Sequence, residues 1–204
     1  MKKAAVLLRI LNHPTDEYEE LKYRKTWSLP LSFILLVCWD IAEILQKQVT
    51  DFKFNTNNTR EFNVLYVLAS TIVLFAMWVV INWSITTLLE GKGRIKEIWV
   101  SCAYALVPYI ATTLLCVVLS HMLTLDESAF LTVIRVLGLL YSFFLLITAL
   151  KVVHSYTFGK TLLCILITVL GMAFVLFLIV LFFGLIQQVI LFFQTIYMEL
   201  MFRR

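Results

Sequence analysis

Residues 161–183 read TLLCILITVLGMAFVLFLIVLFF and contain no charged side chain. A helix needs about 20 mostly apolar residues to cross a bilayer core about 30 Å thick, so this run alone is long enough to span a membrane. The rest of the chain agrees, because 61% of its 204 residues are hydrophobic, 15% are charged and the mean hydropathy is +0.91. This composition excludes a water-soluble globule and indicates a polytopic membrane protein.

Four further apolar runs precede this one, separated by short polar segments. We predict an all-α fold, a bundle of five transmembrane helices in one domain over residues 28–188. The predicted spans are about 28–45, 64–89, 99–122, 130–153 and 161–185. Pro108 lies inside the third span, where its missing N–H and its ring predict a helix kink.

The two ends of the chain differ in character from the predicted bundle. Residues 1–27 form a mixed-charge tail with an apolar component that can rest on the membrane surface. After the fifth span the chain stays apolar, but a narrow polar stripe predicts an amphipathic interfacial helix over 189–204 on the outer face. The stripe consists of Gln188, Thr195, Glu199 and Arg203. Whether residues 186–202 lie at the interface or re-enter the membrane stays open.

The distribution of Lys and Arg predicts the orientation. With the N-terminus inside, eleven basic residues fall on inner segments and six on outer ones, which is the bias expected of cytoplasmic loops. The N-terminus and the loops at 90–97 and 154–160 are then cytoplasmic, while the loop at 46–63 and the C-terminus are outside. The net charge of +4 is spread over several loops and forms no basic stripe, so nucleic acid is not a predicted partner.

No combination of residues predicts catalysis, a metal site or a cofactor. The four cysteines lie in apolar runs without a C-x-x-C pair, and the three histidines fall at separate places in the predicted topology. Glu19 and Glu20 precede Arg24 as in E-E-x-x-x-R intramembrane proteases, but they lie in the tail rather than at membrane depth. Residues 159–161 read Gly-Lys-Thr without the first glycine of a phosphate-binding loop.

Two carboxylates lie within the first predicted span. Asp40 and Glu43 are three residues apart and therefore share one helix face. Charged groups at membrane depth are costly and are usually paired or functional. We predict an ion pair with Arg135 of the fourth span at a similar depth. The alternatives are carboxylates that reach toward the headgroups of the outer leaflet, and a cation or proton pathway.

The turn between the second and third spans is the most distinctive polar segment. Residues 90–97 read EGKGRIKE. Its charged residues favour a cytoplasmic docking loop that recognises charge on a partner, whereas the glycines by themselves favour a tight turn between helices. Both interpretations stay open. The residues of the predicted docking loop are Glu90, Gly91, Lys92, Gly93, Arg94, Lys96 and Glu97.

The same turn carries a resemblance to a known family. Residues 89–97 followed by Tyr104-Ala105-Leu106-Val107-Pro108-Tyr109 resemble the Yip family of Ypt-interacting membrane proteins, in which a G-x-G turn leads into a span containing a proline. His13-Pro14 followed by Tyr18, Leu21 and Lys22 is similar to the short N-terminal signature of its bacterial members. The resemblance covers essentially the whole chain. It implies five spans, a cytosolic N-terminus and an outward C-terminus.

What the resemblance implies is a membrane organiser without enzymatic activity. Its partners would be other membrane proteins, with an ABC-type transport system as the candidate, in a bacterial plasma membrane. The alternative is a small transporter or channel subunit that uses Asp40 and Glu43. Polar residues in the middle of several spans would favour that alternative, and beyond Asn82 and Ser84 they are scarce.

Overall fold

The computed structural model describes residues 2–24, 27–55 and 62–202. Most of these residues are helical, and none of them forms a strand. Five helical segments are long and apolar enough to cross a membrane, as the composition predicts. They form an all-α polytopic fold. Their bounds are Leu29–Gln48 (α3), Val64–Leu88 (α4), Ile95–Ser120 (α5 and α6), Leu125–His154 (a short 3₁₀ turn and α7) and Phe158–Phe202 (α8).

The third span lies at the centre of the bundle. Half of its most apolar stretch is buried, a larger share than in any of the other four. Its first half is α5 (Ile95–Ala105), which is buried continuously from Val100 to Ala105. Ser101, Cys102 and Ala103 are small enough to let α3, α4 and α7 approach closely, which is how helices associate where lipid is as apolar as their side chains.

The third span is divided close to the predicted kink. α5 ends at Ala105 and α6 (Val107–Ser120) begins after Leu106, so that Pro108 lies in the first turn of α6, where proline is tolerated. The N–H of Tyr109 donates to the hydroxyl oxygen of Ser142 on α7 at 2.9 Å. A side chain of a neighbouring helix therefore satisfies a backbone group that the break has freed.

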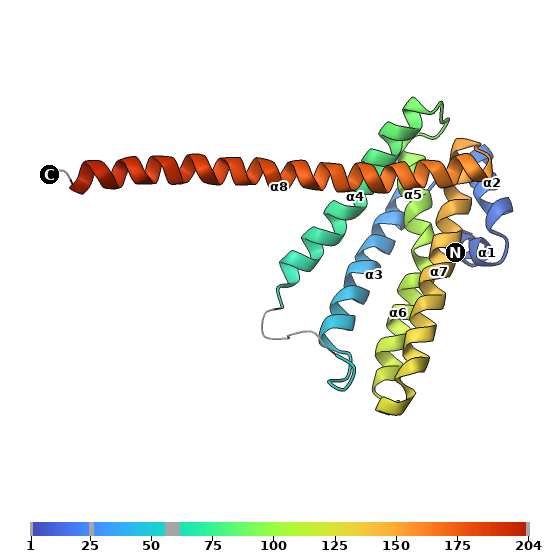
Figure 1. Cartoon of the computed structure of the whole chain (residues 1–204). Helices are drawn as coiled ribbons and strands as arrows, with labels where there is room; N and C mark the ends of the chain where they lie inside the picture. The colour runs from blue at the N-terminus through green and yellow to red at the C-terminus, as the bar shows by residue number, and fades with distance from the viewer. Residues whose placement is uncertain (1, 25–26, 56–61, 203–204) are drawn as a thin grey trace.

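The chain runs up and down, so the connections alternate between two ends of the bundle (Figure 1). One end carries the α4–α5 turn at residues 89–94 and the α7–α8 turn at residues 155–157. We call it the basic end, because it bears Lys92, Arg94, Lys96 and Lys151 as exposed side chains. The opposite end carries the connections from α3 to α4 and from α6 to α7.

The N-terminal segment is not a free tail. It forms α1 (Lys2–Asn12) and α2 (Pro14–Arg24), which lie beside α7 near the basic end (Figure 1). Ile10, Tyr18 and Leu21 are buried in one core with residues of α3, α5 and α7. The apolar component that we expected to rest on the membrane surface therefore packs against the bundle instead.

The C-terminal segment is one uninterrupted helix, α8, from Phe158 to Phe202. The predicted division between a fifth span ending near 185 and a separate amphipathic helix over 189–204 does not appear, because no proline follows Pro108 and the glycines at 171 and 184 are tolerated within a helix. At 45 residues the helix is about 68 Å long, more than twice the hydrocarbon thickness. Residues 203–204 lie outside the described residues.

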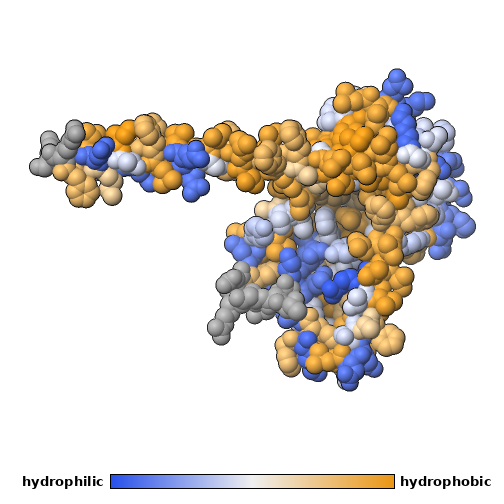
Figure 2. Space-filling model, viewed as in Figure 1, coloured by the Kyte–Doolittle hydropathy of each residue, from blue (hydrophilic) through white to orange (hydrophobic). Residues whose placement is uncertain are grey.

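α8 crosses the bundle rather than running alongside it (Figure 1). Its first three turns pack on α4, where the Asn82 amide donates to the Thr168 hydroxyl at 3.1 Å inside the interface. Gly171 lies close to Ile81 of α4. Beyond this crossing the helix projects as a largely hydrophobic rod with a few hydrophilic residues (Figure 2), and Gln188, Thr195 and Glu199 of the predicted stripe are all exposed.

Tyr18 tests the integration of the N-terminal helices. Its side chain is fully buried, whereas Tyr23 on the same helix is 80% exposed. Tyr18→Ala should lower the stability of the detergent-solubilised protein by about 3 to 5 kcal/mol, the cost of a large cavity, measured as a fall in thermal midpoint. Tyr23→Ala should leave the midpoint nearly unchanged. Equal effects of the two substitutions would show that α2 is not packed as described.

Candidate functional site

The α4–α5 turn is held by close contact with the end of α7. A Cβ atom built on Gly91 would lie 2.7 Å from both His154 Nδ1 and Tyr156 Oη, and one built on Gly93 would lie 2.6 Å from His154 Cε1. These separations are far shorter than van der Waals contact. Both glycines are therefore required because the turn lies directly against His154.

Backbone geometry tightens the same turn. Glu90 adopts a left-handed conformation, with φ of 61°, and the N–H of Gly91 donates to the carbonyl oxygen of Thr86 at 2.7 Å. The Tyr156 hydroxyl lies 3.2 Å from that oxygen and 3.1 Å from the carbonyl oxygen of Leu89. Burial, with smaller effects from Cys164 and Glu90, raises the pKa of the Tyr156 hydroxyl. It therefore remains a donor to these carbonyls.

His154 lies at the centre of this contact. It is 2% exposed, and its ring stacks on that of Tyr156 with 5.3 Å between the centroids. Neither ring nitrogen has a hydrogen-bond partner among the described residues. The imidazole thus acts here as a flat packing surface between two turns.

Lys22 of α2 joins the end of α7 to the N-terminal helices. Its ammonium donates to the Val152 carbonyl oxygen at 2.7 Å and to the Ser155 hydroxyl oxygen at 2.6 Å. A cation at a helix C-terminus satisfies carbonyls that have no partner within the helix. Burial lowers the pKa of Lys22, while the nearby carboxylate of Glu97 raises it and Lys92 lowers it.

The charged side chains of the turn are free of this packing. Glu90, Lys92, Arg94 and Lys96 are exposed, and Glu97 is half-buried, with its carboxylate accepting from the Arg94 N–H at 3.0 Å. The two interpretations of the EGKGRIKE segment are therefore compatible. Its glycines close the turn, and its basic side chains remain available to a partner.

The carboxylates of Asp40 and Glu43 accept hydrogen bonds from neutral groups, including hydroxyls of two neighbouring helices. The Asp40 carboxylate, 4% exposed, accepts from the Thr71 hydroxyl on α4. The Glu43 carboxylate accepts from the Tyr109 hydroxyl on α6 at 2.8 Å and from the Trp39 indole N–H at 3.3 Å. The two carboxylates thereby join α3 to two other spans.

The predicted ion pair with Arg135 is not formed at contact distance. Within the described parts of the chain the ion pair is Arg24–Glu20, at 2.8 Å on the surface of α2. Arg135 lies near Tyr109 and Cys116, and its Nε is buried without a hydrogen-bond partner. Tyr109 takes the place opposite Glu43, so a longer-range association between Arg135 and the carboxylates stays a prediction.

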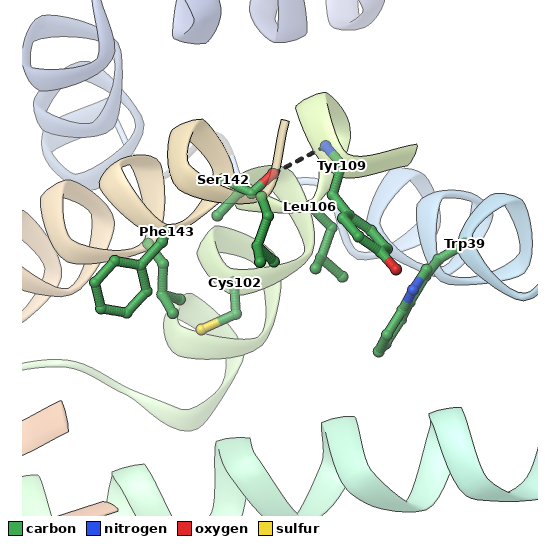
Figure 3. A pocket seen from close by; sticks show the side chains of 9 residues that line it. Trp39, Cys102, Leu106, Tyr109, Ser142 and Phe143 are labelled. Carbon is green, nitrogen blue, oxygen red and sulfur yellow. Dashed lines mark hydrogen bonds between the residues drawn. The ribbon is translucent and has the colours of Figure 1, made fainter. Parts of the chain in front are cut away.

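An apolar cavity lies beside the break in the third span. It has a volume of about 350 Å³ and is bordered by α3, α5, α6 and α7. Figure 3 shows the labelled residues around it and the hydrogen bond from the Tyr109 N–H to the Ser142 hydroxyl oxygen. The labelled lining residues are Trp39, Cys102, Leu106, Tyr109, Ser142 and Phe143. The cavity offers no group for acid–base or nucleophilic chemistry beyond a buried thiol and hydroxyls already engaged in packing.

These features define a helical membrane protein in which a glycine turn, a buried histidine and several lysines meet at the basic end. The family model of the Yip1 domain matches residues 8–182, so the chain belongs to the Yip1 domain family. That family is not a known enzyme family. No curated protein and no solved structure matches the chain.

Sequence reasoning missed the partners of the turn. It placed His154 in an inner loop and assigned Tyr156 no role, although both contact the glycines. The missed signal is local, since a histidine and a tyrosine at the end of a span lie at the same end of the bundle as the G-x-G turn. Their actual contact depends on how the helices pack, which sequence spacing does not specify.

The turn contact predicts a strong difference among three glycines. Gly91→Ala and Gly93→Ala should each cost about 1 to 3 kcal/mol, the usual penalty for overpacking, measured as a fall in thermal midpoint in detergent. Gly159→Ala is the matched control, because a Cβ there meets nothing within 4 Å. That control should leave stability unchanged or slightly raise it. A turn that tolerates alanine as well as position 159 does would not lie against His154.

Proposed function

We propose that this protein is an accessory subunit of the membrane that binds another membrane protein through its basic end and carries out no chemistry itself. The supporting observation is that packing and charge belong to different residues of the turn at 90–97. Its glycines are held against α7, while Lys92, Arg94 and Lys96 extend into the surroundings. A turn whose backbone is fixed by packing, and whose charged side chains are exposed, loses little backbone freedom on binding.

The N-terminal helices contribute to the same face. Lys22 of α2 is close enough to Glu97 and Lys92 to be affected electrostatically by both. Tyr23 and Arg24 on the same helix are exposed. The proposed docking face therefore combines the turn with α2, two segments that are distant in sequence.

The partner is inferred from charge and location. The exposed side chains of Lys92, Arg94 and Lys96 fit an acidic surface, because complementary charge steers association and selects partners. With the N-terminus inside, this face is cytoplasmic. We propose a bacterial plasma membrane, and an acidic cytoplasmic surface of an ABC-type transport system as the partner.

A transporter or channel function is less well supported. Each intramembrane carboxylate is occupied by a hydroxyl from another helix. A pathway would need polar groups through the whole depth of the bundle. The hydrogen bonds of Asp40 and Glu43 favour a role in holding α3 to α4 and α6.

Neutralising the turn tests the proposed docking. In a Lys92→Gln, Arg94→Gln, Lys96→Gln variant the glycines and their packing remain, so the thermal midpoint should not change. Recovery of a partner that co-purifies with the wild-type protein in mild detergent should fall about tenfold or more, because the variant removes three positive charges that would pair with acidic groups of the partner. Quantitative mass spectrometry of the purified material measures this recovery.

Lys47→Gln with Lys53→Gln is the control, because these lysines belong to the opposite end of the bundle. It should leave partner recovery unchanged. Labelling of a single cysteine at position 57 or 157, in a background without the four native cysteines, with an impermeant maleimide should confirm that topology is retained. Undiminished recovery with the neutralised turn, in a protein of normal topology, would confine the loop to a structural role.

A further inference from the structure

A second polar feature of the basic end is separate from the proposed docking turn. A cleft of about 300 Å³ lies between α2 and the C-terminal end of α7. Lys22 and Lys151 lie on its walls together with Glu19 and the hydroxyl-bearing residues Tyr23 and Ser155. The hydrogen bonds of Asp40 and Glu43 involve none of the residues of this cleft, and the cleft shares one residue, Tyr156, with the contacts of Gly91.

The cleft carries an excess of positive charge in an ordered arrangement. Lys22 is fixed by its bonds to Val152 and Ser155, while Lys151 is exposed. Lys160 of α8 holds its ammonium 4.5 Å from the centroid of the Tyr156 ring, and Tyr156 also lines the cleft. Glu19 is the carboxylate in the lining, so two lysines and one carboxylate border the space, and Lys160 adds a third cation next to the ring of Tyr156.

The position of these lysines relative to the spans points to the headgroup layer. Lys151 lies three residues before the end of α7, and Lys160 lies two residues after the start of α8. Long basic side chains at span ends reach the phosphate level of a bilayer. Basic pockets at this level, between helices, match the headgroups of anionic lipids.

Exposed aromatic rings suited to a lipid lie in the cleft wall and at the start of α8. Tyr23 in the cleft wall is 80% exposed, and Phe158 at the start of α8 is 58% exposed. Aromatic side chains are favoured at the membrane interface because their rings tolerate both the apolar and the polar region. A soluble anion would use the lysines alone, whereas a lipid would also use this exposed aromatic surface.

We propose that the cleft between α2 and α7 binds the phosphate of an anionic phospholipid from the leaflet at the basic end, using Lys22, Lys151 and Lys160. The bound lipid would tie the N-terminal helices to the end of α7. This inference goes beyond the proposed docking function. The substitutions that test it, at Lys151 and Lys160, leave the basic residues of the turn intact, so each proposal can fail without the other.

Lipid titration of the full-length protein tests the proposal. The protein purified in mild detergent is titrated with phosphatidylglycerol or with phosphatidylcholine of the same acyl chains, and bound lipid is counted by native mass spectrometry. Phosphatidylglycerol should bind in preference. The Lys151→Gln, Lys160→Gln variant should bind it about five- to twenty-five-fold more weakly, about fivefold for each lysine removed. Lys22 is left intact because it also caps α7.

Controls separate the competing explanations. Lys47→Gln with Lys53→Gln removes the same charge at the opposite end and should leave the lipid preference unchanged. Equal binding of the two lipids, or an equal loss in this control, would overturn the proposal. Displacement by inorganic phosphate at matched concentration would also overturn it, by showing a soluble-anion site. If the double variant does not fold, Lys151→Gln alone gives the same test, since that side chain is exposed.

Discussion

The contact between the α4–α5 turn and His154 is the constraint on which the rest of the structure depends. Gly91 and Gly93 allow the turn to lie directly against the end of α7. Because α5 begins immediately after this turn, the contact places α5 at the centre of the bundle, where it packs on α3, α4 and α7. The same arrangement leaves the basic side chains of the turn exposed at one end.

Hydrogen bonds between helices add to the stability that apolar packing gives the bundle. In lipid there is no hydrophobic force to bring spans together, so small residues and interhelical hydrogen bonds carry specificity. Asp40 bonds to Thr71, Glu43 to Tyr109 and Asn82 to Thr168, and each bond joins a different pair of helices. Charged groups at membrane depth therefore have a structural use here that does not require transport. The features left exposed for partners gather at the basic end.

The sequence predicted the elements better than their packing. Five apolar runs and the G-x-G turn were enough for the fold class and the family, because span length and turn chemistry are local properties. The burial of Tyr18 was not predictable from a mixed-charge segment. Whether the apolar side of that segment contacts protein or lipid depends on how it packs against α7, which the segment's own sequence does not specify. The continuity of α8 was missed because the polar side chains near residue 188 indicate an interface without supplying a helix breaker. Arg135 was predicted to pair with Asp40 and Glu43 because their depths in the membrane match. Depth alone does not indicate that the Tyr109 hydroxyl bonds to Glu43.

A double-mutant cycle on Gly93 and His154 tests the central contact most directly. The thermal stabilities of the wild type, Gly93→Ala, His154→Ala and the double variant are compared in the same detergent. If the turn lies against the imidazole, removing the ring takes away two of the three nearest atoms that the added methyl group would meet, and Cγ1 of Val153, 2.6 Å away, is the third. The double variant should then be more stable than the sum of the single effects predicts, by about 0.5 to 3 kcal/mol, the usual coupling of residues in contact. Strict additivity would contradict this account of how the basic end is built.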